Sequence, residues 1–313
     1  MTNQTYRNLE EAVSQSNSIE FLTTRHSKSG EDAPSYPGLS QDGVEMARSR
    51  AEDMIRIIND SPDGTVLLYG GISNAPRTGA TAKAYIDEMQ KILGDNIYFV
   101  RKKDIKKRTK AYGANPEGYM RTIKEMASEL KFKPNQKVVV ELPMPLKSFC
   151  YETHLAGPDG KTDHSRWTQL HADHKKDYSG AIAEWFSNPE LIKLFNPEEI
   201  ARRQIKDMET LANLSKKLFP NRPVKIGFVG HSFLLDALQT YLANDGKISR
   251  EGFEKIGGKV VDNAELARIA VDEGNNMYLQ YRGKDFVLDS GKGLYGLAEN
   301  DAGAIGGIEN IAR

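Results

Sequence analysis

Two histidines and two arginines draw attention first, because their side chains are those that phosphoryl transfer uses. A neutral imidazole can attack phosphorus and carry the phosphoryl group as a covalent intermediate. Guanidinium groups hold phosphate oxygens through paired hydrogen bonds and offset their charge. The four residues are Arg25, His26, Arg77 and His231. Taken singly, each is more ordinary as a solvated loop residue, a partner of a carboxylate or a structural histidine.

Each of these residues lies just beyond a short apolar run rich in β-branched side chains, which predicts a strand. Helical patterns alternate with the runs, and this order is typical of a largely parallel sheet covered by helices on both faces. We therefore expect a three-layer αβα sandwich. Ligands of such sheets gather at the carboxyl ends of the strands, so the motifs should share one edge. The predicted strands are residues 19–24, 65–69, 97–101, 138–142 and 224–229.

Apolar residues at helical spacing predict four long helices. Ser40 can cap the first of them, and Asn196 followed by Pro197 is typical of a helix start. Two apolar runs on either side of Arg282-Gly283-Lys284 predict a hairpin near the C-terminus. The expected helices are residues 40–59, 78–93, 197–219 and 233–243, and the hairpin strands are residues 277–281 and 285–288.

The domain organisation expected is one large α/β domain. It would cover residues 19–297 and carry an inserted cap or lid at about residues 143–195, where the apolar period fades. A polar N-terminal extension, residues 1–18, would precede it, and a Gly- and Ala-rich flexible tail, residues 298–313, would follow.

Composition restricts the classes of partner. Basic and acidic residues both number 43 in 313, so no net positive field exists for nucleic acid or an anionic membrane. Cys150 is the single cysteine, which excludes an internal disulfide and favours a reducing compartment. No apolar stretch has the length of a signal peptide or a membrane span. We expect a cytoplasmic protein without nucleic-acid or membrane partners, and its oligomeric state is left open.

In combination, the motifs resemble those of the histidine phosphatase superfamily, the phosphoglycerate-mutase-like group. That family has Arg-His-Gly after the first strand, Ser-x-x-x-Arg-x-x-x-Thr-Ala after the second, and Gly-His late in the chain. The resemblance covers roughly residues 20–242 outside the insertion, with Ser27 and Asp32 in place of the family's usual glycine and asparagine. The matching residues are Arg25 and His26, then Ser73, Arg77, Thr81 and Ala82, then Gly230 and His231.

The resemblance implies a metal-independent phosphomonoester phosphatase without a cofactor, acting on an unidentified phosphorylated small molecule. His26 would carry the phosphoryl group, while Arg25, Arg77 and His231 stabilise the transition-state charge. Ser27 and Ser232 are expected as further substrate contacts. A phosphomutase of the same family, or a catalytically silent member that binds a phosphorylated ligand or a protein, remains an alternative.

A proton donor for the leaving oxygen is also needed, and the family generally takes a carboxylic acid from the middle of the chain. Glu141, at the end of a predicted strand, is expected either to be this acid or to pair with Arg25 or Arg77. Glu152 in the insertion is its rival.

Histidines are concentrated in the insertion. His171 and His174 could share a helical face and hold a divalent metal with Asp173 or Asp177. A solvated polar lid is the better interpretation, because the spacing completes no closed ligand set.

Overall fold

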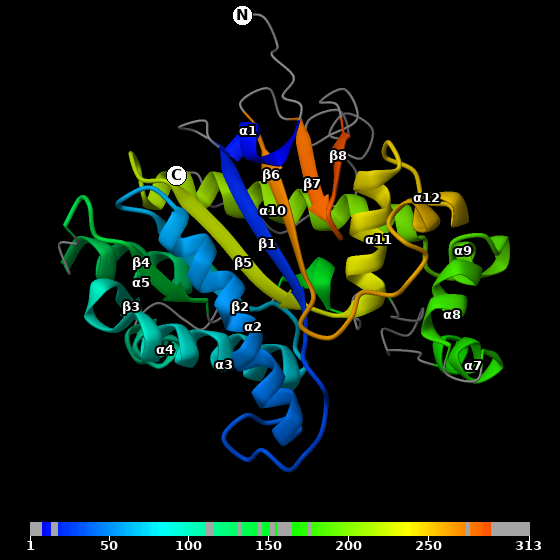
Figure 1. Cartoon of the computed structure of the whole chain (residues 1–313), viewed down its shortest axis with the longest axis horizontal. Coiled ribbons are helices and arrows are strands. Elements are labelled where there is room, and N and C mark those ends of the chain that lie inside the picture. The colour runs from blue at the N-terminus through cyan, green and yellow to red at the C-terminus, as the bar shows by residue number, and fades with distance from the viewer. Residues whose placement is uncertain are drawn as a thin grey trace, which may run out of the picture.

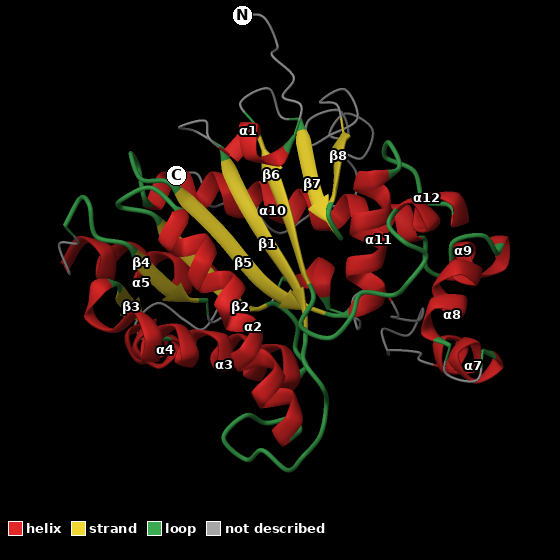
Figure 2. Cartoon of the chain, viewed as in Figure 1, coloured by secondary structure: helices red, strands yellow, loops and turns green. Residues whose placement is uncertain are grey.

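The computed structural model describes residues 8–13, 18–109, 116–129, 133–142, 146–150, 154, 165–174, 177–272 and 276–288. They form a sheet with helices on both faces, as predicted (Figures 1 and 2). None of the helices in these ranges is long and apolar enough to cross a bilayer. The expected C-terminal tail, residues 298–313, lies outside the described residues.

The sheet joins eight described strands in the order β3-β4-β2-β5-β1-β6-β7-β8. The strands from β3 to β1 are parallel to one another, whereas β6, β7 and β8 each run antiparallel to their neighbours. All five predicted parallel strands and the hairpin are confirmed. The bounds are β1 (Ile19–Arg25), β2 (Val66–Gly71), β3 (Tyr98–Val100), β4 (Val138–Glu141), β5 (Val224–Gly230), β6 (Leu266–Val271), β7 (Met277–Tyr281) and β8 (Lys284–Leu288).

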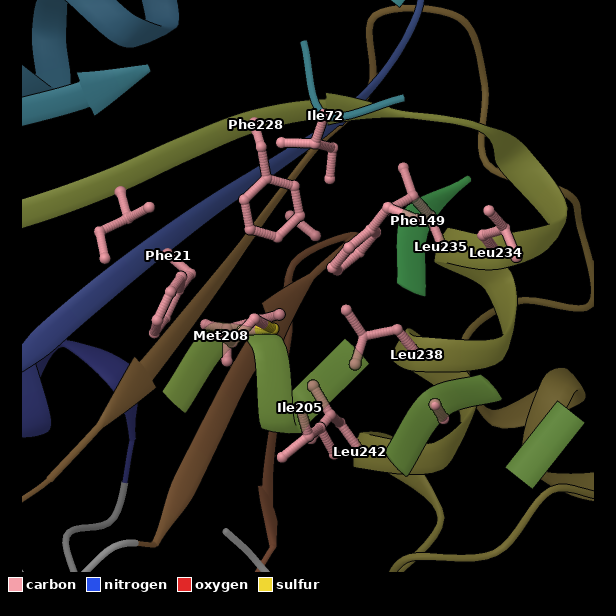
Figure 3. Packing of buried hydrophobic residues seen from close by; sticks show 14 of the residues in the cluster. Phe21, Ile72, Phe149, Ile205, Met208, Phe228, Leu234, Leu235, Leu238 and Leu242 are labelled. Carbon is pink, nitrogen blue, oxygen red and sulfur yellow. The ribbon is translucent and has the colours of Figure 1, made fainter. Parts of the chain in front are cut away.

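Side chains that alternate along the strands divide the interior into two cores. Phe21 of β1 joins one core, and the adjacent Leu22 joins the other. The helices α2 (Gln41–Asp60) and α3 (Pro76–Leu93) cover the Leu22 side, while α10 (Pro197–Leu218) and α11 (Ser232–Ala243) cover the Phe21 side. Figure 3 shows the core on the Phe21 side of the sheet, in which Phe21 and Phe228 face Met208 of α10 and Leu238 of α11.

The predicted caps are confirmed. The Ser40 side chain accepts a hydrogen bond from the backbone N–H of Gly43, and Asn196 accepts from those of Glu198 and Glu199. A side-chain oxygen at this position satisfies N–H groups that have no partner within the helix. These caps fix where α2 and α10 begin.

Several short helices, of five to nine residues, were not predicted, because so few residues show too little of the 3.6-residue period. The 14-residue helix α5 was also not predicted. The α8 helix and the chain after it lie within the predicted insertion, yet Ile182, Trp185 and Phe186 are buried in the core. The insertion is therefore not a solvated lid throughout. The remaining helices are α1 (Leu9–Val13), α4 (Lys102–Thr109), α5 (Pro116–Glu129), α7 (Ser165–Asp173), α8 (Tyr178–Trp185), α9 (Pro189–Leu194), α12 (Arg250–Lys255) and the 3-10 turns η1 (Gly94–Asn96) and η2 (Lys147–Phe149).

One described part of the predicted N-terminal extension packs on the sheet. Leu9 and Ala12 of α1 are buried against Ala270 and Tyr278 of β6 and β7.

A buried ion cluster lies near the amino ends of β1 and β5. Glu20, 2% exposed, accepts from Lys225 through one carboxylate oxygen and from Arg268 Nε at 2.6 Å through the other. Both partners come from strands adjacent to β1. The cluster links the parallel and antiparallel parts of the sheet.

Candidate active site

The strand order brings the two histidines together. Arg25 pairs in register with Gly230, so His26 and His231 are the residues that follow the ends of two adjacent strands. The backbone N–H of His26 donates to the Gly230 carbonyl at 3.0 Å, and the two ring centroids are 5.1 Å apart. On the other side of β5 lies β2, which leads through a short loop into the first turn of α3, where Arg77 lies. The four residues therefore converge at the carboxyl edge, as the sequence predicts.

The contacts of His26 determine which ring nitrogen can react. Its Nδ1 lies 2.7 Å from the Ser27 carbonyl oxygen, which can only accept, so Nδ1 carries the proton and Nε2 keeps its lone pair. Burial lowers the pKa of His26 to about 3, and the charges of Arg77 and Arg25 act in the same direction. The ring is neutral at physiological pH, and the lone pair is on Nε2.

His231 is fully buried and is held between two polar groups. Its Nδ1 lies 3.5 Å from Arg77 Nη2, and its Nε2 lies 2.8 Å from Ser73 Oγ. Because a guanidinium only donates, Nδ1 accepts and Nε2 donates to the serine. Burial, followed by the proximity of His26 and the two arginines, keeps the pKa of His231 well below its usual range. Ser73, one of the motif residues, thus orients the second histidine.

Each arginine has a buried Nε–H group that donates to no described protein group. Arg25 donates from Nη1 to the Val261 carbonyl at 2.6 Å, but the Nε atoms of Arg25 and Arg77 are buried without a hydrogen-bond partner among the described residues. Within that same part of the chain, neither guanidinium forms an ion pair with a carboxylate. The alternative that Arg77 serves as a carboxylate partner finds no support there. Buried cationic donors of this kind suit a phosphate.

Two helix N-termini add further donors to the site. The N-cap residues that precede α3 and α11 are Ala75 and His231, and neither caps its helix with a side-chain hydrogen bond. Five other helices, α2, α8, α9, α10 and α12, begin at a Ser, Asp or Asn whose side chain does accept from the first turn. The first N–H groups of a helix attract anions. In α3, however, Pro76 has no N–H, and the N–H of Thr78 donates to the Ala75 carbonyl at 3.1 Å. The first turn of α11 therefore offers more N–H donors to an anion than the first turn of α3.

The two predicted serine contacts have different surroundings. Ser27 is fully buried, its Oγ donates to the Gly43 carbonyl at 2.7 Å, and its N–H donates to Thr81 Oγ1 at 3.0 Å. Both donors are occupied, so Ser27 supports the loop between β1 and α2 rather than the substrate, which corrects the prediction. Ser232 is the first residue of α11, directly after His231, and its substrate contact stays a prediction.

Glu141 does not pair with Arg25 or Arg77 as one alternative predicted. Its Oε2 accepts from Arg101 Nε at 2.9 Å and from the N–H of Lys102 at 3.1 Å. Arg101 also donates to Asp87, so this cluster ties β3 and β4 to α3. The carboxylate has a structural role at this position.

The sheet register also separates Glu141 from the nucleophile. Glu141 pairs with Tyr69, Tyr69 with Gly227, and Gly227 with Leu22, which lies four residues before His26. This corresponds to about 13 Å along the strand and about 14 Å across three strand spacings. The rival acid, Glu152, lies outside the described residues.

Asp32, a departure from the family pattern, is exposed, and its Oδ1 accepts from the N–H of Gln41 at the start of α2. Its carboxylate therefore has a partner at that helix start.

The described histidines of the insertion have contacts of their own. His154 Nε2 lies 2.7 Å from the Ser148 carbonyl, and His174 Nε2 lies 2.7 Å from Glu184 Oε2. The side chain of His171 and the whole of His164 lie outside the described residues. Within those residues, no three His, Cys, Asp or Glu side chains form a group that could hold a metal ion.

Comparisons with known proteins find distant similarity to solved structures. No protein-family model and no curated protein matches the sequence. Solved structures similar to the chain include "Mycobacterial hydrolase 1" (15% identity, 85% of this chain and 99% of that chain, TM-score 0.41). A mycobacterial glucosyl-3-phosphoglycerate phosphatase with VO3 (15%, 80% and 90%, 0.37) and the alpha-ribazole phosphatase of Shigella flexneri (15%, 81% and 91%, 0.34) are also similar. At this distance the likeness carries no functional assignment, which rests on the site itself.

The buried histidines should make folding stability depend on acid. Between about pH 3 and 6.5 these two histidines bind more protons in the unfolded chain than in the native protein, because both folded pKa values lie below the ordinary 6.5. Asp236 opposes part of this effect, because burial raises the pKa of its carboxyl to about 8. The free energy of unfolding should therefore decrease as the pH falls below 6.5, by up to about 1.4 kcal/mol per pH unit for each histidine. Urea unfolding between pH 4.5 and 6.5 measures this slope. His231→Gln should lower it by about one proton, and an unchanged slope would contradict the buried neutral state.

Proposed function

We propose that this protein is a phosphomonoester phosphatase that works through a phosphohistidine on His26 Nε2. The observation that carries the proposal is a neutral, buried imidazole whose Nε2 is unprotonated, beside two guanidiniums with buried donors that no described group accepts. A nucleophile and an oxyanion site are thus found together.

The reaction follows from these positions in two displacements. In the first, Nε2 attacks phosphorus, the bond from phosphorus to the ester oxygen breaks, and the leaving oxygen takes a proton from an acid. In the second, water attacks phosphorus and gives a proton to the conjugate base of that acid, while the bond from Nε2 to phosphorus breaks. Inorganic phosphate is released, and His26 regains its lone pair. Arg25, Arg77 and the N–H groups of α3 and α11 stabilise the charge on the equatorial oxygens.

We also propose that the proton donor comes from the insertion rather than from β4. Leu146 donates its N–H to the Ile72 carbonyl at 2.9 Å, and Phe149 packs against Phe228 with ring centroids 4.9 Å apart. Ile72 directly precedes Ser73, the residue that orients His231. The described chain that leads toward Glu152 therefore lies beside the loop between β2 and α3, which contains Ser73. Glu141, in contrast, is bound to Arg101.

Glutamine substitutions should separate the two candidate acids. Glu152→Gln should reduce kcat on an alkyl phosphate by about a hundredfold. On an activated aryl phosphate, whose leaving group needs no proton, the same variant should reduce kcat much less. Glu141→Gln should affect both substrates equally and mildly, since it removes a contact to Arg101. Steady-state kinetics on the two substrates measures both effects. The opposite pattern would return the role of acid to Glu141.

Hydrolysis of an aryl phosphate in the presence of excess chelator tests the function. Because arginines and helix N–H groups provide the electrostatic stabilisation, exhaustive chelation should leave the rate unchanged. Activity that disappears with chelation and returns with zinc or manganese would refute metal independence. Phosphate binding without turnover would instead indicate a silent binding protein.

A further inference from the structure

Arg25 is held by a backbone segment instead of a carboxylate. Its Nη1 donates to the Val261 carbonyl at 2.6 Å, and its own carbonyl accepts from the N–H of Ala264 at 3.1 Å. We call residues 256–265, between α12 and β6, the holding segment. The direction of the Arg25 guanidinium depends on where this segment places one carbonyl oxygen.

Asp236 binds Val261, the residue whose carbonyl oxygen accepts the hydrogen bond from Arg25. The N–H of Val261 donates to Asp236 Oδ1 at 2.9 Å, and both residues are fully buried. Asp236 belongs to α11, five residues after His231. It therefore connects the helix that begins at the second histidine to the segment that holds the first arginine.

The rest of the holding segment is fixed by a different residue. Arg282 donates to the carbonyls of Ile256, Lys259 and Val260, at 3.1, 2.8 and 3.0 Å, and pairs with Glu265. None of these contacts involves the N–H of Val261. Without an acceptor at position 236, a buried N–H would lose its hydrogen-bond partner, which is unfavourable and favours rotation of that peptide.

We propose that Asp236 is a positioning residue for phosphate binding, which acts through Val261 to orient the Arg25 guanidinium toward the pocket of His26 and His231. This role rests on the proposed function of that pocket. It requires a hydrogen-bond acceptor and no charge.

The electrostatics around Asp236 agree with a neutral acceptor. Burial raises the pKa of its carboxyl to about 8, against the opposing effects of the Val261 hydrogen bond and of Arg25 and Arg282, while Glu265 adds to the increase. Its Oδ2 is buried and has no hydrogen-bond partner in the described ranges. An asparagine, which keeps the acceptor oxygen, should therefore replace it.

Three variants test the role by their affinity for inorganic phosphate, measured by calorimetry on protein whose folding is checked by thermal unfolding. Asp236→Leu removes the acceptor and should weaken phosphate binding about tenfold, since losing a charge-assisted contact of about 1.4 kcal/mol has that effect. Asp236→Asn should stay within about threefold of wild type. Gln239→Leu is the matched control, because Gln239 is also fully buried on α11 and has no contact with the holding segment among the described hydrogen bonds. It should bind phosphate as the wild type does.

A coupling measurement separates positioning from general destabilisation. In an Arg25→Ala background, Asp236→Leu should cause no further loss of phosphate affinity, because the group that it positions is gone. A folded Asp236→Leu protein with wild-type affinity would overturn the proposal, as would an equal loss in Gln239→Leu. If Asp236→Leu does not fold, the Asn variant decides, and a tenfold loss in it overturns the role. If the wild-type protein binds phosphate but hydrolyses no phosphate ester, the proposed function is refuted. The positioning role of Asp236 is then still decided by the phosphate affinities of the variants.

Discussion

His26→Ala should abolish turnover of phosphate monoesters and leave the protein folded. The variant removes the only atom proposed to bond to phosphorus, and the remaining arginines and helix N–H groups cannot form a covalent intermediate. We expect kcat to decrease at least about a thousandfold. The ring makes one described hydrogen bond, to the Ser27 carbonyl, so thermal unfolding should change little.

Trapping the intermediate makes this measurement specific. Acid quenching of the wild-type protein during turnover of a radiolabelled ester should leave acid-labile, alkali-stable phosphate on the chain, and His26→Ala should carry none. His174→Ala is the matched control, since His174 pairs with Glu184 away from the pocket. A variant without His26 that kept most of its rate would refute the mechanism.

Arg77→Lys should decrease kcat/KM by about a hundredfold, although it keeps the positive charge. The guanidinium places Nη2 near His231 Nδ1 and keeps Nε for an oxyanion, two directions that a single ammonium cannot reproduce. Steady-state kinetics on an aryl phosphate measures the loss.

A matched exchange elsewhere controls for charge and length. Arg202→Lys alters an exposed arginine that pairs with Glu198 on α10, and it should keep wild-type kinetics. Near-normal kcat/KM in Arg77→Lys would mean that this guanidinium does not contact the phosphate.

The parallel strands and long helices could be predicted because each has a local signal. An uninterrupted apolar run predicts a strand that is buried on both faces, and Ser40 and Asn196 show where helices begin. The antiparallel strand β6 was missed, because Arg268 interrupts its apolar run and becomes acceptable only next to Glu20, 248 residues away.

The residues of the site also include some that a local sequence signal reveals and others that have none. Motif spacing placed Arg25, His26, Arg77 and His231 at one edge, because strand ends converge in a parallel sheet. The role of Ser27 was mistaken, since its partners Gly43 and Thr81 lie in other elements. The role of Val261 had no sequence signal, because it acts through a backbone carbonyl, which any residue has. Asp236 was missed because its partner, Val261, lies in another segment of the chain. Such supporting contacts emerge only from the tertiary structure.

The buried ion cluster at the amino ends of the strands has a consequence for the opposite end. If β6 slipped by one residue against β1, Arg268 would point to the other face and leave part of the Glu20 charge uncompensated, which costs about 3–5 kcal/mol. The same slip would carry the holding segment, which leads directly into β6, about 3.3 Å along the sheet. Val261 would then no longer meet Arg25. The ion cluster at one end of the sheet thus fixes the strand register on which the phosphate pocket at the opposite end depends. The register that pairs Arg268 with Glu20 is also the one that brings the Val261 carbonyl to the Arg25 guanidinium.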